Sequence, residues 1–143
     1  MSNRQRQVAD SSQKGRERYR MYKNVLERCA KAKENGFYLE AIALIESIMA
    51  DRLESYLIRI TSNTNYAFKP LGSLIKGLRA INDLQMPIAE IENWKKARNQ
   101  FLHEMAKIED GQYEDFSTRY SAALQCVEEG ESLFRQIDVI CRK

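Results

Sequence analysis

The segment from Phe37 to Thr61 repeats apolar residues at spacings of three and four, and this pattern constrains the fold more than any other feature of the chain. An α-helix turns once in about 3.6 residues, so this spacing gathers the apolar side chains on one side and the polar ones on the other. The segment is therefore predicted to be the most hydrophobic helix of the protein. Its apolar stripe contains Leu39, Ile42, Ile45, Met49, Leu53, Tyr56, Leu57 and Ile60.

Four further segments are predicted to be helical. The 143 residues include only 2 Pro and 6 Gly, so few residues break a helix. Asn35-Gly36 ends the first segment, because glycine readily adopts the conformation found just past a helix, and Gly130 is expected to allow close packing. The prediction is an all-α, four- to five-helix antiparallel bundle, with one domain over residues 16–143 and a mobile, polar and basic tail over residues 1–15. The predicted helices span residues 16–35, 37–61, 71–82, 88–110 and 114–141.

Several kinds of protein are disfavoured by what the sequence lacks. It has no run of about 18 apolar residues that could span a membrane, and the N-terminus has no apolar core of a signal peptide. The three cysteines, Cys29, Cys126 and Cys141, are far apart, and with 1 His no metal-ligand spacing exists. We expect reduced thiols, no metal or cofactor, and a cytoplasmic location.

Positive charge is concentrated in the first quarter of the chain. Residues 1–35 carry ten Lys or Arg and four Asp or Glu, whereas the remainder carries 13 basic and 16 acidic residues. Such a basic segment could contact phosphates. It could equally form a solvated helix face of mixed charge, and both interpretations stay open.

One constellation with an obvious chemical use lies on the predicted helix 88–110. Arg98 falls within its apolar stripe, where a guanidinium needs a carboxylate, a phosphate or water because it stays protonated. Asn99 and His103 lie four residues apart on the neighbouring face. Glu46, at the edge of the most hydrophobic stripe, is a candidate partner for Arg98. The alternative is a border position in which the Glu46 carboxylate faces water.

The run Arg98-Asn99-Gln100-Phe101-Leu102-His103 resembles the motif of the HEPN superfamily (higher eukaryotes and prokaryotes nucleotide-binding). That motif is Arg, four to six residues and then His on the fourth helix of a bundle, commonly with Asn or another polar residue after the Arg. Residues 41–53 also resemble the apolar second helix of the family with its embedded acid. The resemblance implies a metal-independent endoribonuclease of toxin–antitoxin or phage-defence type. RNA would be cleaved by attack of the ribose 2′-OH on the adjacent phosphorus.

The residue roles implied by the resemblance are chemically reasonable. His103 would act as general base or acid, because imidazole titrates near neutral pH. Arg98 would hold the phosphate, Asn99 would orient the phosphate or the imidazole, and Glu46 would support them. Five helical positions separate Arg98 from His103, about 140° around the axis. Each chain would therefore supply half of a site in a homodimer, as in the family. An antitoxin or regulatory protein is a further implied partner.

Two other functions stay open. The first is a HEPN-like module without catalysis that binds nucleotide, RNA or a protein partner. The second is a plain helical interaction protein in which Arg98 pairs with Glu46 for structural reasons. RNA cleavage in EDTA that depends on Arg98 and His103 would separate the ribonuclease from both.

Overall fold

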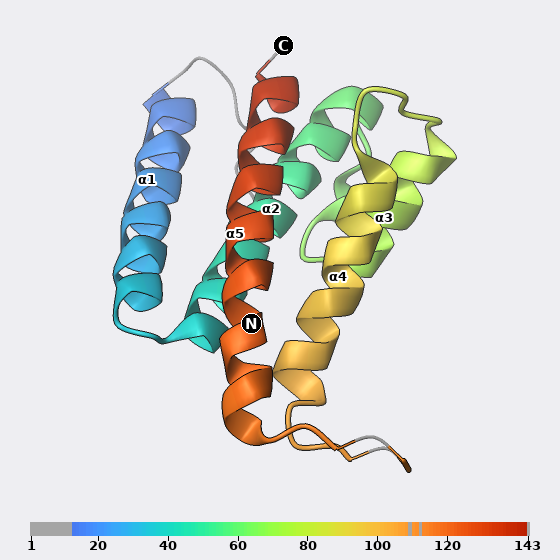
Figure 1. The fold of residues 1–143 in the computed structure, drawn as a ribbon. Coiled ribbons are helices and arrows are strands. Elements are labelled where there is room, and N and C mark those ends of the chain that lie inside the picture. Colours follow the sequence, from blue (N-terminus) through green and yellow to red (C-terminus); the bar gives the residue numbers. More distant parts are fainter. Residues whose placement is uncertain (1–12, 109, 112, 143) are drawn as a thin grey trace, which may run out of the picture.

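The computed structural model describes residues 13–108, 110–111 and 113–142. Within these residues the chain forms five α-helices and one turn of 3-10 helix, with no strand (Figure 1). The all-α prediction is confirmed. The first helix begins three residues before the predicted boundary at residue 16, and residues 1–12 of the predicted tail lie outside the described part. The elements are α1 (Gln13–Glu34), α2 (Tyr38–Thr61), η1 (Thr64–Tyr66), α3 (Leu71–Ala80), α4 (Ile88–His103) and α5 (Phe116–Cys141).

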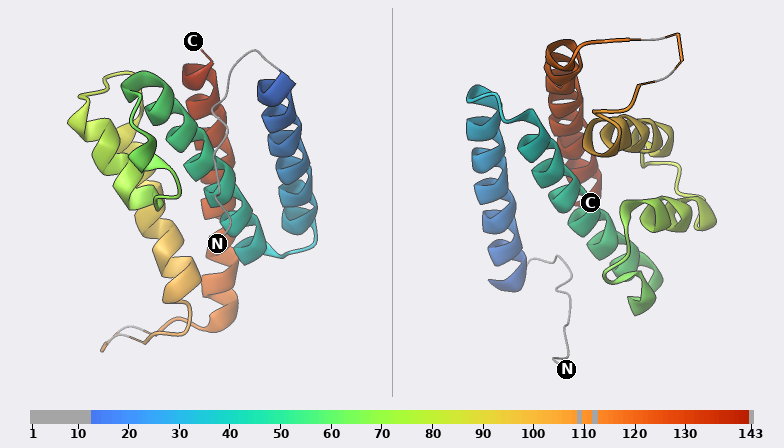
Figure 2. Two further views of the ribbon diagram at one scale, coloured as in Figure 1. Left: turned by 180° about the vertical axis from the view of Figure 1, so that it is seen from behind. Right: turned by 90° about the horizontal axis from the view of Figure 1, so that it is seen from below.

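The central element is α2, which contacts every other helix of the described chain. In Figure 1, α1 and α4 run downward while α2 and α5 run upward, so α1–α2 and α4–α5 are antiparallel neighbours. Figure 2 shows α2 between α1 and the α3–α4 pair when the bundle is seen from below. The predicted apolar stripe faces this core, except that Ile60 is 50% exposed. Its fully buried members are Ile42, Ile45, Met49, Leu53 and Leu57.

Gly36 lies just past the end of the first helix, in the turn between α1 and α2, as predicted. Gly36 adopts a φ of 80°, a conformation that costs glycine little. The side chain of Tyr120, on α5, fixes this turn from outside. Its hydroxyl donates to the Gly36 carbonyl at 2.5 Å and accepts from the Tyr38 backbone N–H at 3.1 Å. The turn between α1 and α2 is therefore held in place by a residue more than 80 positions later in the chain.

The predicted end of the fourth helix at Asp110 is wrong, because α4 ends at His103. A contact with the last helix stabilises this earlier end. The guanidinium of Arg119 donates to the backbone carbonyls of Met105, at 3.0 Å, and of Lys107. These carbonyls would accept intrahelical hydrogen bonds if α4 continued. The chain after His103 instead turns toward the start of α5.

Close packing between α4 and α5 depends on Gly130, as the sequence predicts. Trp94 is 3% exposed, and its indole N–H donates to the Cys126 carbonyl at 2.9 Å. A Cβ atom at position 130 would lie only 2.7 Å from the same indole nitrogen. Glycine therefore lets the tryptophan ring lie directly on the α5 backbone.

The three cysteines are buried free thiols, as expected. They lie at Cys29 on α1 and at Cys126 and Cys141 on α5. None of the described helices is long and apolar enough to cross a membrane.

Candidate functional site

Packing of α4 against α2 brings Arg98 and Glu46 together. The Nη2 atom of Arg98 lies 2.6 Å from Oε1 of Glu46, and the two side chains are 11% and 26% exposed. The structure thus selects the ion pair over a Glu46 carboxylate that faces water alone. Nη1 of Arg98 also donates to Oδ1 of Asn99 at 2.6 Å. These two contacts fix the guanidinium within a single chain.

The ion pair compensates the charge of Arg98 before any ligand arrives. Its Nε atom is buried and has no hydrogen-bond partner among the described residues. A phosphate that bound this guanidinium would have to approach the Glu46 carboxylate, which repels it, or displace that carboxylate. Removing one member of a buried pair costs more than the pair contributes, because the other charge is left without compensation. The geometry therefore suits a structural contact between α2 and α4.

His103 lies apart from this pair. It is the last residue of α4, and its exposed side chain makes no hydrogen bond to any described residue. Half-buried Asn99 lies one helical turn before it, and Arg98 is five positions away around the helix. The structure brings both Glu46 and Asn99 into contact with Arg98. It does not bring His103 into contact with Arg98 within one chain.

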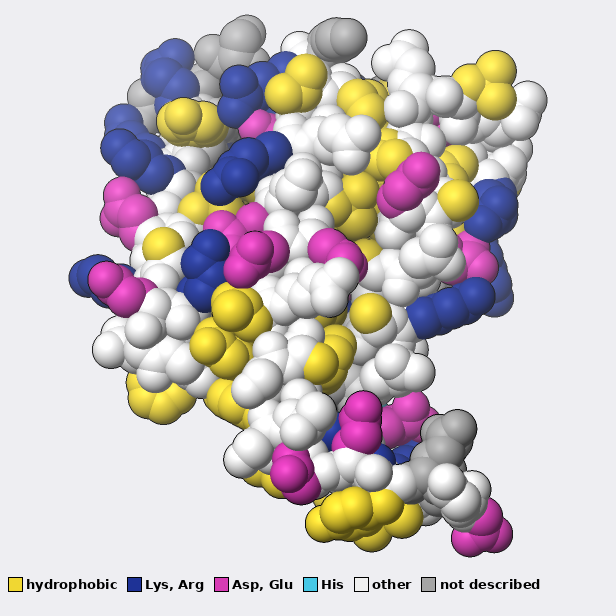
Figure 3. All heavy atoms as spheres, viewed as in Figure 1, with side chains coloured by type: hydrophobic (Ala, Val, Ile, Leu, Met, Phe, Trp, Pro, Cys, Tyr) yellow, Lys and Arg dark blue, Asp and Glu magenta, His cyan; other side chains and the backbone are white. Residues whose placement is uncertain are grey.

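Large apolar side chains reach the surface in and just after the segment that follows His103. The chain segment that follows α4 includes Ile108, which is 69% exposed, and Tyr113, which is 76% exposed, and α5 begins with Phe116, which is 62% exposed. Exposed apolar groups that lie close together are typical of surfaces that bind another protein. Figure 3 shows apolar side chains at the lower end of the molecule, where α5 begins.

A second candidate site lies toward the opposite end of the bundle, where α1 begins and α5 ends. A cavity of about 390 Å³ opens there between α1, α2 and α5. Figure 3 shows Lys and Arg side chains gathered over this end of the molecule. The basic excess of residues 1–35 was one signal for this site in the sequence, but it did not predict which arginines would meet. The arginines that line the cavity are Arg16, Arg18, Arg52, Arg59 and Arg142.

No group of three or more His, Cys, Asp and Glu side chains that could hold a metal ion occurs in the described part of the chain. No protein-family model, curated protein or solved structure matches this sequence.

Proposed function

We propose that the chain is a HEPN-like helical module that binds RNA or nucleotide without cleaving it. The observation that carries this proposal is the ion pair between Arg98 and Glu46 at 2.6 Å, with the Arg98 side chain only 11% exposed. A catalytic guanidinium must offer its charge to the phosphate as negative charge develops in the transition state. Here that charge is already compensated.

The class of ligand is inferred from charge. Five arginines, contributed by α1, α2 and the residue that directly follows α5, meet at one end of the bundle. Phosphate groups are the ligands that arginine binds best, because its planar guanidinium forms paired hydrogen bonds to their oxygens. Positive charge also attracts nucleic acid from a distance. An RNA or nucleotide ligand explains this clustering of positive charge better than contact with a neutral protein surface does.

A ribonuclease is the second candidate, and the exposed imidazole of His103 favours it. In that case two copies would pack through the apolar end of the bundle and each would contribute half of the site. His103 would then transfer the proton at the ribose 2′-OH or at the leaving oxygen. Arg98 would have to exchange Glu46 for a phosphate. An antitoxin partner belongs to this second candidate.

One experiment separates the two functions. Wild-type protein, His103→Ala and Gln100→Ala are incubated with fluorescent single-stranded RNA in EDTA, and both cleavage and mobility shift are recorded. Gln100 is the control, because it is also exposed on α4. We expect a salt-dependent shift without cleavage by all three proteins. Cleavage that is lost only in His103→Ala would establish the ribonuclease instead, and the absence of any shift or cleavage would overturn both functions.

A further inference from the structure

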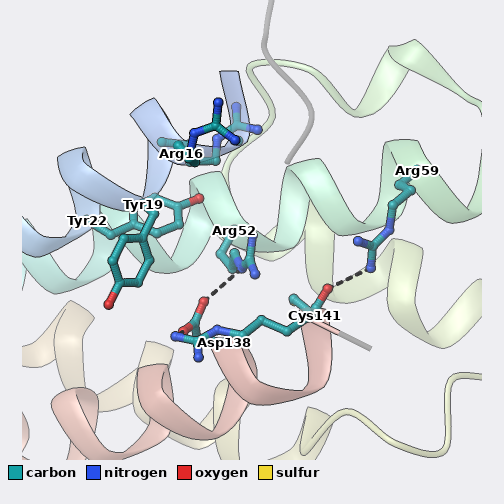
Figure 4. A pocket seen from close by; sticks show the side chains of 10 residues that line it. Arg16, Tyr19, Tyr22, Arg52, Arg59, Asp138 and Cys141 are labelled. Carbon is teal, nitrogen blue, oxygen red and sulfur yellow. Dashed lines mark hydrogen bonds and ion pairs between the residues drawn. The ribbon is translucent and has the colours of Figure 1, made fainter. Parts of the chain in front are cut away.

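The arginine-lined cavity is formed by the consecutive helices α1 and α2 together with α5, which lies far from them in the sequence. Figure 4 shows Arg16 from α1, Arg52 and Arg59 from α2, and Asp138 and Cys141 from α5 around one space. Arg52 and Arg59 are seven residues apart, so two helical turns bring them to the same side of α2. The volume of the cavity, about 390 Å³, falls within the range of roughly 300–1,000 Å³ that is usual for small-ligand sites.

Positive charge at the cavity exceeds the negative charge of its described neighbours. Asp138 is the acidic residue that lines it, and two arginines share that carboxylate. Nε of Arg52 lies 3.0 Å from Oδ1, and Arg142 pairs with Oδ2. Arg59 donates to a neutral group, the Cys141 carbonyl, at 2.7 Å. The three arginines contributed by α2 and by the chain just after α5 therefore have one carboxylate among them, and it pairs with two of them.

Arg18 adds a fourth guanidinium, and it has its own carboxylate. Its Nε lies 3.1 Å from Oδ2 of Asp51, on α2. This pair contributes no net charge to the cavity, but it fixes α1 against α2 and so maintains the cavity wall. Arg16 lines the cavity from the same helix.

Arg52 is the member of the group that most requires an additional acceptor. It is 8% exposed, and its Nε–H is not aligned for a hydrogen bond to Asp138 although the two atoms are within ion-pair distance. A buried N–H without an acceptor is costly. An anion in the cavity would supply oxygen acceptors to Arg52 and to Arg59 together. The charge excess at the cavity therefore indicates a negatively charged ligand.

An exposed aromatic ring indicates what the anion is attached to. Tyr19 lines the cavity, is 57% exposed, and has the guanidinium carbon of Arg142 5.8 Å from its ring centroid. Bases stack on exposed aromatic rings and on guanidinium planes. We propose that this cavity binds a nucleoside phosphate, either free or at the end of an RNA strand, with the phosphate on Arg52 and Arg59 and the base beside Tyr19. The inference rests on the proposed function and gives its ligand a site.

Calorimetric titration tests the site with adenosine 5′-monophosphate, inorganic phosphate, and one RNA hexamer prepared with either a 5′-phosphate or a 5′-hydroxyl. The variants are Arg59→Gln, Arg142→Gln and Tyr19→Leu, and melting curves verify that each is folded. Arg79→Gln is the matched control, because Arg79 is an exposed arginine on α3, away from the cavity. Each arginine variant should weaken binding of the nucleotide about tenfold, as expected for one charge-assisted hydrogen bond. Tyr19→Leu should weaken the nucleotide but not inorganic phosphate.

The possible results have distinct meanings. Tighter binding of the 5′-phosphorylated hexamer than of the 5′-hydroxyl hexamer would identify an RNA end as the source of the phosphate, and binding of the mononucleotide alone would identify a free nucleotide. If RNA or nucleotide binds equally to wild type, Arg59→Gln and Arg142→Gln, the cavity assignment is wrong while the proposed function stands. If wild-type protein binds none of the four probes, both inferences fail.

Discussion

Replacing Arg98 with alanine leaves the Glu46 carboxylate at the edge of the core without its cation. Breaking a fully buried ion pair in this way costs roughly 3–5 kcal/mol. The Glu46 side chain is 26% exposed, so water can solvate part of the remaining charge. We therefore expect a smaller loss, about 2 kcal/mol of unfolding free energy. For a chain of 143 residues, this corresponds to a fall in Tm of about 7 °C.

Urea and thermal unfolding of four proteins would measure this effect: wild type, Arg98→Ala, Glu46→Ala and the double variant. The two single losses should sum to more than the loss in the double variant, because removal of both charges leaves neither without compensation. Arg98→Met retains much of the apolar volume and separates the loss of charge from the loss of packing.

The exposed pair of Arg79 and Glu92 provides the control. It also joins neighbouring helices, but its two side chains are 54% and 36% exposed. Exposed ion pairs contribute little to stability, so Arg79→Ala should lower Tm much less than Arg98→Ala. Equal effects of the two substitutions, or strictly additive losses at positions 46 and 98, would refute the structural role of the Arg98–Glu46 pair.

The other predictions concern packing and the thiols. Gly130→Ala should destabilise the protein by about 1–3 kcal/mol, because the new Cβ would contact the Trp94 ring at 2.7 Å; Gly72→Ala is the control, since its Cβ would meet only the flexible end of Lys95. Burial raises the pKa of Cys29 to about 11 and that of the two α5 cysteines to about 12. The unfolded chain therefore loses these protons first, and the urea midpoint should fall as the pH rises from about 8.5 toward 11. A thiol reagent at pH 8 should react slowly with the folded protein and rapidly after unfolding; rapid reaction of the folded protein would contradict the burial.

Local patterns in the sequence account for most of the helices. The spacing of apolar residues together with Gly36 predicted the limits of α2 and the start of α3 to within one residue. The end of α4 could not be predicted in this way. It depends on Arg119, which binds carbonyls of residues 105 and 107 from another helix, and no local pattern encodes that contact.

The candidate sites, like the helices, could be predicted only in part. The sequence identified Glu46 and Arg98 as possible partners, because each is a charged group on or beside an apolar stripe. Whether Glu46 pairs with Arg98 or faces water depends on how α2 packs against α4. Only the structure shows that the pair forms. The arginine-lined cavity was missed because residues that line it, such as Arg59 and Arg142, are more than 80 positions apart in the sequence. The basic excess of residues 1–35 was the only hint.

The central position of α2 also limits how the chain can be divided. A fragment that stopped after Thr61 would retain α1 and α2 but lack α5, against which α2 packs most extensively. Its long apolar stripe would then face water, and two helices cannot bury enough of it to offset the entropy of ordering the chain. The complementary fragment would lack the helix around which its own three are arranged. Each half therefore depends on the other for its structure, and the two are expected to fold only when they associate.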